Sequence, residues 1–199
     1  PDTYMEKIAI GSNLPKNLVD LDNSVEKNIS LLAEAKNTTP DKITVCILER
    51  SRHNKIIASL KKMKVNLKLI SDGDVSGIIY IVDKNSPVDM YIGIGGGPEG
   101  VLAASAIDAY KCKFQGRFIF DNDKDIERAK KMGIEDLNKK YELKEIIKGD
   151  SIFCATGITT GDLVKGIKIK DNNYITETLV THKSTNTCEI VTRKDTIKT

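Results

Sequence analysis

The stretch GIGGGPEG at residues 93–100 has the composition of a turn that handles phosphate. It follows a short apolar run and precedes an alanine-rich helical pattern, so it should join a strand to a helix. Glycines let backbone N–H groups approach an anion at a helix start, and Pro98 suits the first helical turn. Glu99 would repel that phosphate unless a divalent cation lay between them, and carboxylates together with phosphate oxygens commonly hold Mg²⁺ or Mn²⁺.

Charged side chains follow two other apolar runs of the sequence. Arg50 and Arg52 come directly after ITVCIL, and Asp72 and Asp74 come after LKLI. Ligands of open α/β sheets bind beyond the carboxyl ends of the strands. Guanidinium groups can fork onto phosphate oxygens. The two carboxylates could accept hydrogen bonds from sugar hydroxyls or bind a hard cation.

Each of these features also has a purely structural interpretation. The arginines could be exposed residues at a helix start, Asp74 could cap a helix after an Asp-Gly turn, and Glu99 could simply favour the helix dipole. The glycine stretch also fits the dinucleotide fingerprint G-x-G-x-x-G over residues 95–100. Against that interpretation, Glu99 would occupy the place of the pyrophosphate, and the motif follows the third strand of the alternation.

The elements that must position these residues alternate along the chain. Apolar runs predict strands at 4–10, 43–48, 67–70, 90–94, 114–120 and 151–155, and helical patterns fall between them at 24–36, 53–63, 76–82, 98–110, 123–132 and 142–147. This alternation predicts an α/β fold, a layered and largely parallel or mixed sheet flanked by helices. We expect the carboxyl ends of the strands at 43–48, 67–70, 90–94 and 151–155 to converge on one site. Three further segments, 167–170, 174–182 and 187–192, predict antiparallel strands.

Composition excludes several classes of protein. The 199 residues carry a net charge of +3 with both signs interspersed, and there is no Trp, so neither nucleic acid nor a membrane surface is an expected partner. No apolar run is long enough to span a membrane, and we expect neither a membrane span nor a signal peptide. The four cysteines form no C-x-x-C pair and are expected to be reduced thiols of a cytoplasmic protein.

The chain resembles the class II fructose-1,6-bisphosphatases of the GlpX type. The resemblance rests on seven segments in order: YMEK (4–7), RSRH (50–53), SDGD (71–74), GIGGGPEG (93–100), QGR (115–117), ATGITTGDLVKG (155–166) and TETL (176–179). It implies the fold of the metal-dependent sugar phosphatases related to inositol monophosphatase. It also implies hydrolysis of the 1-phosphate of fructose 1,6-bisphosphate, a gluconeogenic reaction, with Mg²⁺ or Mn²⁺.

The resemblance further implies the roles of individual residues. Substrate contacts would come from Tyr4, Arg50, Ser51, Arg52, Asp72, Gly73, Asp74 and Gly96, and Glu99 would bind the metal. Ser51 stands where the family usually has proline. Some members also accept sedoheptulose 1,7-bisphosphate, and a homo-oligomer is expected of the complete enzyme.

One departure from the family pattern changes what we expect of this chain. The other metal-binding carboxylates of the family lie in a lobe that precedes Tyr4, so this sequence carries one metal ligand and no further catalytic residue. We expect residues 1–12 to be a terminal strand of that lobe, 13–199 to be the substrate-binding domain, and the chain alone to be inactive. The alternatives are an NAD(P)-binding oxidoreductase domain that uses residues 95–100, and a non-catalytic module that binds sugar phosphates.

Overall fold

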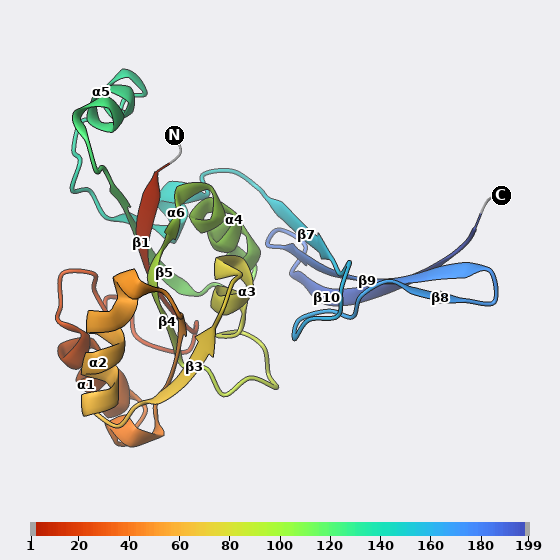
Figure 1. Ribbon diagram of the computed structural model, residues 1–199, viewed down its shortest axis with the longest axis horizontal. Helices are drawn as coiled ribbons and strands as arrows, with labels where there is room; N and C mark the ends of the chain where they lie inside the picture. The colour runs from red at the N-terminus through yellow and green to blue at the C-terminus, as the bar shows by residue number, and fades with distance from the viewer. Residues whose placement is uncertain (1–2, 198–199) are drawn as a thin grey trace.

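Two sheets organise the chain in the computed structural model, which describes residues 3–197 (Figure 1). The larger sheet has six strands in the order β3-β2-β4-β1-β5-β6. They are β1 (Tyr4–Ile10), β2 (Thr44–Leu48), β3 (Asn66–Ile70), β4 (Met90–Gly96), β5 (Lys113–Ile119) and β6 (Tyr141–Glu142). β2 runs parallel to β3 and β4, whereas β1 is antiparallel to both β4 and β5. Four strands therefore point one way, and the expected mixed α/β sheet is confirmed.

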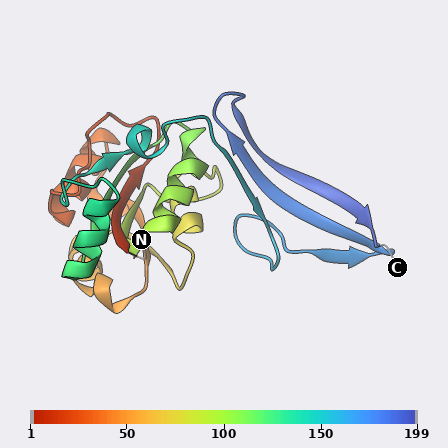
Figure 2. The ribbon, with the colours of Figure 1, turned by 90° about the horizontal axis from the view of Figure 1, so that it is seen from above.

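Helices cover both faces of this sheet (Figure 2). The helices of the chain are α1 (Val25–Ala35), α2 (Asn54–Lys62), α3 (Asp74–Ile79), α4 (Gly97–Asp108), α5 (Asp123–Lys131) and α6 (Leu143–Ile146), with single 3₁₀ turns at Pro40–Lys42 and Ser51–His53. Of these, α5 stands apart from the sheet in Figure 1. Side chains of β1 alternate between two cores: Ile8 and Ile10 join the α1 and α2 side, whereas Met5 and Ala9 join the α3 and α4 side. Within residues 3–197, no helix has both the length and the apolar character needed to cross a membrane.

Local sequence signals account for several helix ends. The Ser24 side chain accepts a hydrogen bond from the Lys27 N–H and caps α1, as its position before the apolar pattern predicts. α5 is followed by Gly133, whose φ of +85° is the left-handed conformation that suits glycine. The helix expected from residue 76 begins earlier, at Asp74, because Gly73 turns the chain with a φ of +90°.

A second, antiparallel sheet extends away from the α/β body in Figures 1 and 2. It contains β7 (Ile152–Thr156), β8 (Lys168–Lys170), β9 (Asn173–His182) and β10 (Thr187–Thr196), in the order β10-β9-β7 with β8 also on β9. The three antiparallel segments were predicted correctly. The expectation that the strand at 151–155 ends at the common sheet edge was wrong, because β7 pairs only with β9 among the described strands. A continuous apolar run suits a buried strand of either sheet, so periodicity could not choose between them.

β1 lies in the middle of the six-stranded sheet, with β4 on one side and β5 on the other. Its seven residues pair one-to-one with both neighbours, so both of its edges are occupied. The assignment of residues 1–12 to a separate lobe stays a prediction, and residues 1 and 2 lie outside the described part of the chain.

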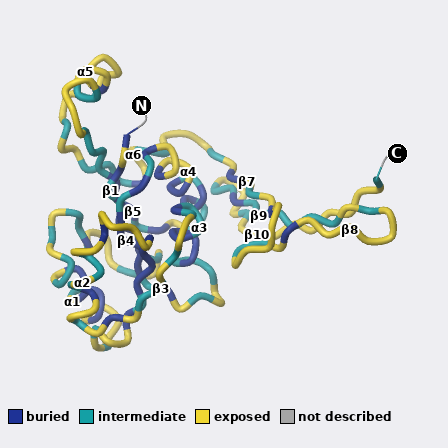
Figure 3. The backbone as a smooth tube through the Cα atoms, viewed as in Figure 1, coloured by how far each residue is buried: buried dark blue, intermediate teal, exposed yellow. Residues whose placement is uncertain are grey.

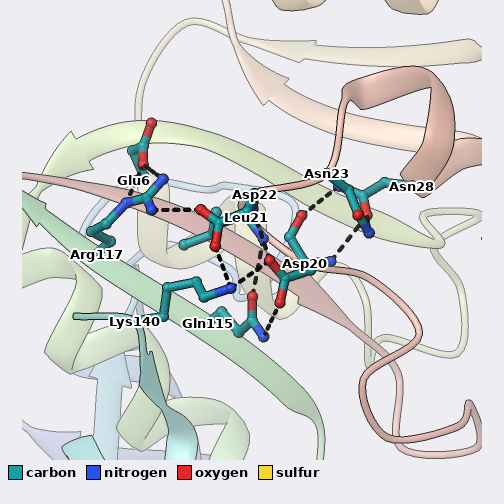
Figure 4. Close-up of polar contacts among 9 residues, drawn as sticks. All are labelled: Glu6, Asp20, Leu21, Asp22, Asn23, Asn28, Gln115, Arg117 and Lys140. Atoms are coloured by element: carbon teal, nitrogen blue, oxygen red, sulfur yellow. Dashed lines mark hydrogen bonds and ion pairs between the residues drawn. The ribbon is translucent and has the colours of Figure 1, made fainter. Parts of the chain in front are cut away.

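The QGR segment (residues 115–117, in β5) bonds to the long connection between β1 and α1 (Figure 4). Arg117 bonds to the Glu6 carboxylate at 2.7 and 2.9 Å and to Asp22 at 2.6 Å. The Gln115 side chain accepts a hydrogen bond from the Leu21 N–H at 3.1 Å. Asp20 and Asp22 both bind Lys140 at 2.6 Å. These carboxylates, Asp20 above all, raise the pKa of Lys140. This segment is therefore part of the scaffold, on the face that α1 covers.

Candidate functional site

A cleft of about 540 Å³ lies at the carboxyl edge of β2 and β4. Because β1 is antiparallel to β4, its first residue comes to this same edge, and Tyr4 lies opposite Gly96. Eight of the nine predicted site residues line the cleft: Tyr4, Arg50, Arg52, Asp72, Gly73, Asp74, Gly96 and Glu99. The ninth, Ser51, begins the 3₁₀ turn between the two arginines.

A buried ion pair lies against the floor of the cleft. The Lys7 side chain is fully buried and binds the carboxylate of Asp74, which is 7% exposed. The same ammonium group donates to the Gly96 carbonyl at 3.1 Å. Burial lowers the pKa of Lys7, while the nearby carboxylates of Asp74 and Glu99 act in the opposite direction. The Lys7 ammonium thus joins β1, α3 and the end of β4.

The sequence analysis missed Lys7, although the sequence contains a signal for it. In the strand YMEKIAI, alternation places Lys7 on the same side as Met5 and Ala9, which are both buried. A lysine on the apolar side of a strand requires a partner inside the protein. The partner, Asp74, is distant in sequence, so only the fold reveals the pair.

Gly95 and Gly96 leave room for two carboxylates. A Cβ atom on Gly95 would lie 1.6 Å from Oδ2 of Asp74, and one on Gly96 would lie 1.9 Å from Oε2 of Glu99. Gly96 has a φ of −59°, which any residue can adopt, so the requirement there is space. The role of these glycines in bringing N–H groups to a phosphate stays a prediction.

The same geometry disfavours a dinucleotide site at residues 95–100. Two carboxylates lie against the glycines, where a pyrophosphate would require positive or neutral surroundings. The motif also lacks the usual unit of two adjacent parallel strands, because β1 lies between β4 and β5 in the sheet.

Asp72 and Asp74 line the same cleft in different environments. The Asp72 side chain is 94% exposed and lies 3.9 Å from the Arg50 guanidinium. Its Oδ1 accepts a hydrogen bond from the Gly73 N–H at 2.9 Å, across the turn that the left-handed glycine makes possible. Asp72 is therefore free to meet solvent or a ligand, whereas Asp74 is held by Lys7.

Arg52 is held over the cleft by two contacts. Its Nε donates to the Ile94 carbonyl at 2.9 Å. The centre of its guanidinium lies 5.1 Å from the centroid of the Tyr4 ring, within the range of a cation–π contact. Among the described residues, the two terminal nitrogens make no hydrogen bond, so they can fork onto an anion.

His53 is a buried residue that connects β2 to β4 through its ring. Its Nδ1–H donates to the Leu48 carbonyl at 2.7 Å, and its Nε2 accepts the Ile94 N–H at 2.8 Å. Burial lowers the pKa of His53, which favours the neutral ring that this arrangement requires. Since both ring nitrogens are engaged, His53 positions the strand that carries Ile94 and is not a ligand for substrate or metal.

The described residues do not form a complete metal-binding site by themselves. Among residues 3–197, no group of three or more His, Cys, Asp or Glu side chains is placed to hold a metal ion. Glu99 is exposed in the first turn of α4 and fits a single ligand position, whereas Asp74 already pairs with Lys7.

A second cavity, of about 450 Å³, lies toward the other end of β1. It is lined mainly by apolar atoms, including those of Ile8, Ile10 and Phe114, and by none of the predicted site residues. Charged residues at its wall neutralise one another, since Lys183 binds Asp108 at 2.9 Å and Lys16 binds Glu142 at 3.2 Å. Because the arginines and the glycine-rich turn line the cleft and not this cavity, we assign the candidate site to the cleft.

Comparison with known proteins points to one family. Residues 1–195 match the family described as bacterial fructose-1,6-bisphosphatase, glpX-encoded. A D-fructose 1,6-bisphosphatase class 2/sedoheptulose 1,7-bisphosphatase of Trichodesmium erythraeum is 33% identical over 96% of this chain and 59% of its own length. A fructose-1,6-bisphosphatase class 2 of Haemophilus influenzae is 36% identical over 90% of this chain and 58% of its own length. The chain thus spans less than two thirds of the length of these relatives.

The close contacts at Gly95 and Gly96 give a matched pair of predictions. Gly95→Ala must displace the Asp74 carboxylate from buried Lys7, and we expect a loss of roughly 3 kcal/mol in the free energy of unfolding. Gly96→Ala meets only the flexible, exposed Glu99 side chain and should cost less than about 1 kcal/mol. Urea denaturation followed by circular dichroism measures both values. Equal losses for the two variants would contradict the proposed packing of the carboxylates.

Proposed function

The chain belongs to the glpX-encoded bacterial fructose-1,6-bisphosphatase family, and we propose that its cleft binds fructose 1,6-bisphosphate for hydrolysis of the 1-phosphate. The observation that carries this proposal is the meeting of two arginines and three carboxylates in one cleft of about 540 Å³. A cleft of that size suits a small molecule, since such sites commonly measure roughly 300–1,000 Å³. The arginines supply charge for a phosphate, and the carboxylates supply acceptors for sugar hydroxyls.

Each residue of the cleft has a distinct part in this proposal. Arg52, held by the Ile94 carbonyl and the Tyr4 ring, would bind the phosphate that is not cleaved, together with Arg50. Exposed Asp72 and the Lys7-bound Asp74 would orient the sugar hydroxyls.

The remaining contacts in the proposal come from smaller groups. Gly73 and Gly96 would offer backbone groups, Tyr4 a ring face, and Ser51 a hydroxyl at the edge of the cleft. These four residues lie beside the arginines or on the turns that place the carboxylates.

We propose Glu99 as one ligand of a Mg²⁺ or Mn²⁺ ion. Such an ion, when bound, activates water and stabilises charge on the phosphate. The carboxylate is exposed beside Gly96 and the helix start, where a phosphate oxygen could share the ion. Residues 3–197 offer too few further donors to complete the site, so their part in the proposal is to bind and orient the substrate.

The proposal extends to a second substrate and to the place of the reaction in the cell. The name of the Trichodesmium erythraeum relative includes sedoheptulose 1,7-bisphosphatase, so we propose that bisphosphate as a second substrate. The reaction would serve gluconeogenesis in the cytoplasm, in a homo-oligomeric complete enzyme.

We expect Arg52→Ala to weaken the binding of fructose 1,6-bisphosphate by about ten- to a hundredfold, because hydrogen bonds to charged groups contribute roughly 1.5–3 kcal/mol each. Isothermal titration calorimetry on the chain measures the affinity. Arg128→Ala, on exposed α5, is the matched control and should leave it unchanged. Equal affinities for the two variants, or saturable binding of NAD(H) without binding of the bisphosphate, would refute the proposed site.

The chain alone should release little or no phosphate from fructose 1,6-bisphosphate in the presence of Mn²⁺, because Glu99 is a single ligand. A phosphate-release assay on the purified chain tests this, with Arg52→Ala as the control for contaminating phosphatase. Release that depends on Mn²⁺ and disappears in Arg52→Ala would show that the chain holds a complete catalytic site and would overturn this expectation.

A further inference from the structure

The second sheet leaves one long strand edge without a partner. β9 pairs with β10 along its whole length and with β8 and β7 on its other side. β10 pairs with β9 over ten residues in an unbroken one-to-one register, and among the described strands nothing pairs with its outer edge. Nine of those ten residues are exposed, including Ile190 and Val191 near the middle of the strand (Figure 3).

The hydrogen-bond pattern shows which backbone groups face outward. The Ile197 N–H donates to the Asn172 carbonyl at 2.9 Å, in continuation of the β9–β10 ladder. Because hydrogen-bonded pairs alternate along an antiparallel ladder, odd-numbered residues of β10 bond to β9 and even-numbered residues direct their N–H and C=O groups outward. The outward groups belong to Cys188, Ile190, Thr192, Lys194 and Thr196.

This edge lacks several of the devices that usually prevent pairing with another strand. Natural edge strands are commonly short, bulged, interrupted by proline or covered. β10 is ten residues long and has neither bulge nor proline; its charged residues are Glu189 near its start and the sequence RKD (193–195) toward its end. A ribbon exposed on both faces is at best marginally stable in water by itself. The outward backbone groups of β10 are therefore available to pair with a further strand.

We propose that β10 is the docking edge for the polypeptide that full-length relatives carry outside the region matched by this chain, and that this polypeptide adds a strand beside β10. The proposal rests on the proposed function, which requires further metal ligands from such a polypeptide. The relatives supply a suitable occupant, since about two fifths of their length lies outside the match. The strand β1 cannot serve as this docking edge, because β4 and β5 occupy both of its sides.

One loop of the second sheet reaches the region of the candidate site. Asp162, in the loop between β7 and β8, binds Lys68 of β3 at 3.1 Å and accepts a hydrogen bond from the Tyr80 hydroxyl at 2.8 Å. This loop lines a hollow that includes Asp72, which also lines the cleft. This loop therefore links the second sheet to the region of the cleft, whereas β10 lies on the opposite side of β9 from β7.

The test uses the chain and the unmatched part of the Haemophilus influenzae relative, tagged and co-expressed. We expect the tag to recover the chain. Thr192→Pro, which removes an outward N–H without touching the β9 ladder, should reduce recovery by about tenfold or more. Thr192→Val keeps the N–H and a β-branched side chain, so it should be recovered as well as the unchanged chain. No recovery, or equal recovery of the proline and valine variants, would overturn the proposal.

Amide exchange followed by NMR provides the second measurement. In the chain alone, the outward amides of Ile190 and Thr192 should exchange faster than those of Val191 and Arg193, and the complex should protect them selectively. Protection that grows with the concentration of the chain alone would identify a second copy as the occupant and contradict the proposal. Recovery through β10 without phosphatase activity would refute the proposed function only, whereas restored activity with unprotected outward amides would refute the docking edge only.

Discussion

The structure of the cleft depends on one buried ion pair, that of Lys7 with Asp74. Burial of two charges is costly unless each is paired and hydrogen-bonded, so the two residues must come together for the fold to form as it does. The pair joins the middle of β1 to the first residue of α3, and the Lys7 ammonium also holds the Gly96 carbonyl. Glycine at 95 follows from the same pair, because a Cβ atom there would occupy the position of the Asp74 carboxylate.

The antiparallel placement of β1 brings the pair and the cleft together. A strand that runs against its neighbours delivers its first residue to their carboxyl edge, and this explains why Tyr4 reaches the cleft from the start of the chain. On the other side of the cleft, Ile94 of β4 is held twice, by Arg52 at its carbonyl and by His53 at its N–H. Contacts with the single residue Ile94 thus position both Arg52 and His53.

Hydrophobic patterns and motifs predicted most of the elements and the residues that gather in the cleft. Asp72, Arg50 and Glu99 were accessible to sequence reasoning because they follow apolar runs that end at the same edge of a sheet. Lys7 and His53 were not recognised, since their partners are distant in sequence and only the fold brings them together. The pairing of β7 with β9 was missed for a related reason: an apolar run shows that a strand is buried and does not show which sheet buries it.

The central claim is that this cleft is a sugar-bisphosphate site organised from four separate segments of the chain. The most direct measurement is a titration of the ¹⁵N-labelled chain with fructose 1,6-bisphosphate, followed by NMR. The account predicts saturable shifts that gather at Tyr4, at residues 50–52 and 72–74, and at residues 95–99. Shifts that gather instead around Ile8, Ile10 and Phe114 in the second cavity, or the absence of saturable shifts, would contradict it.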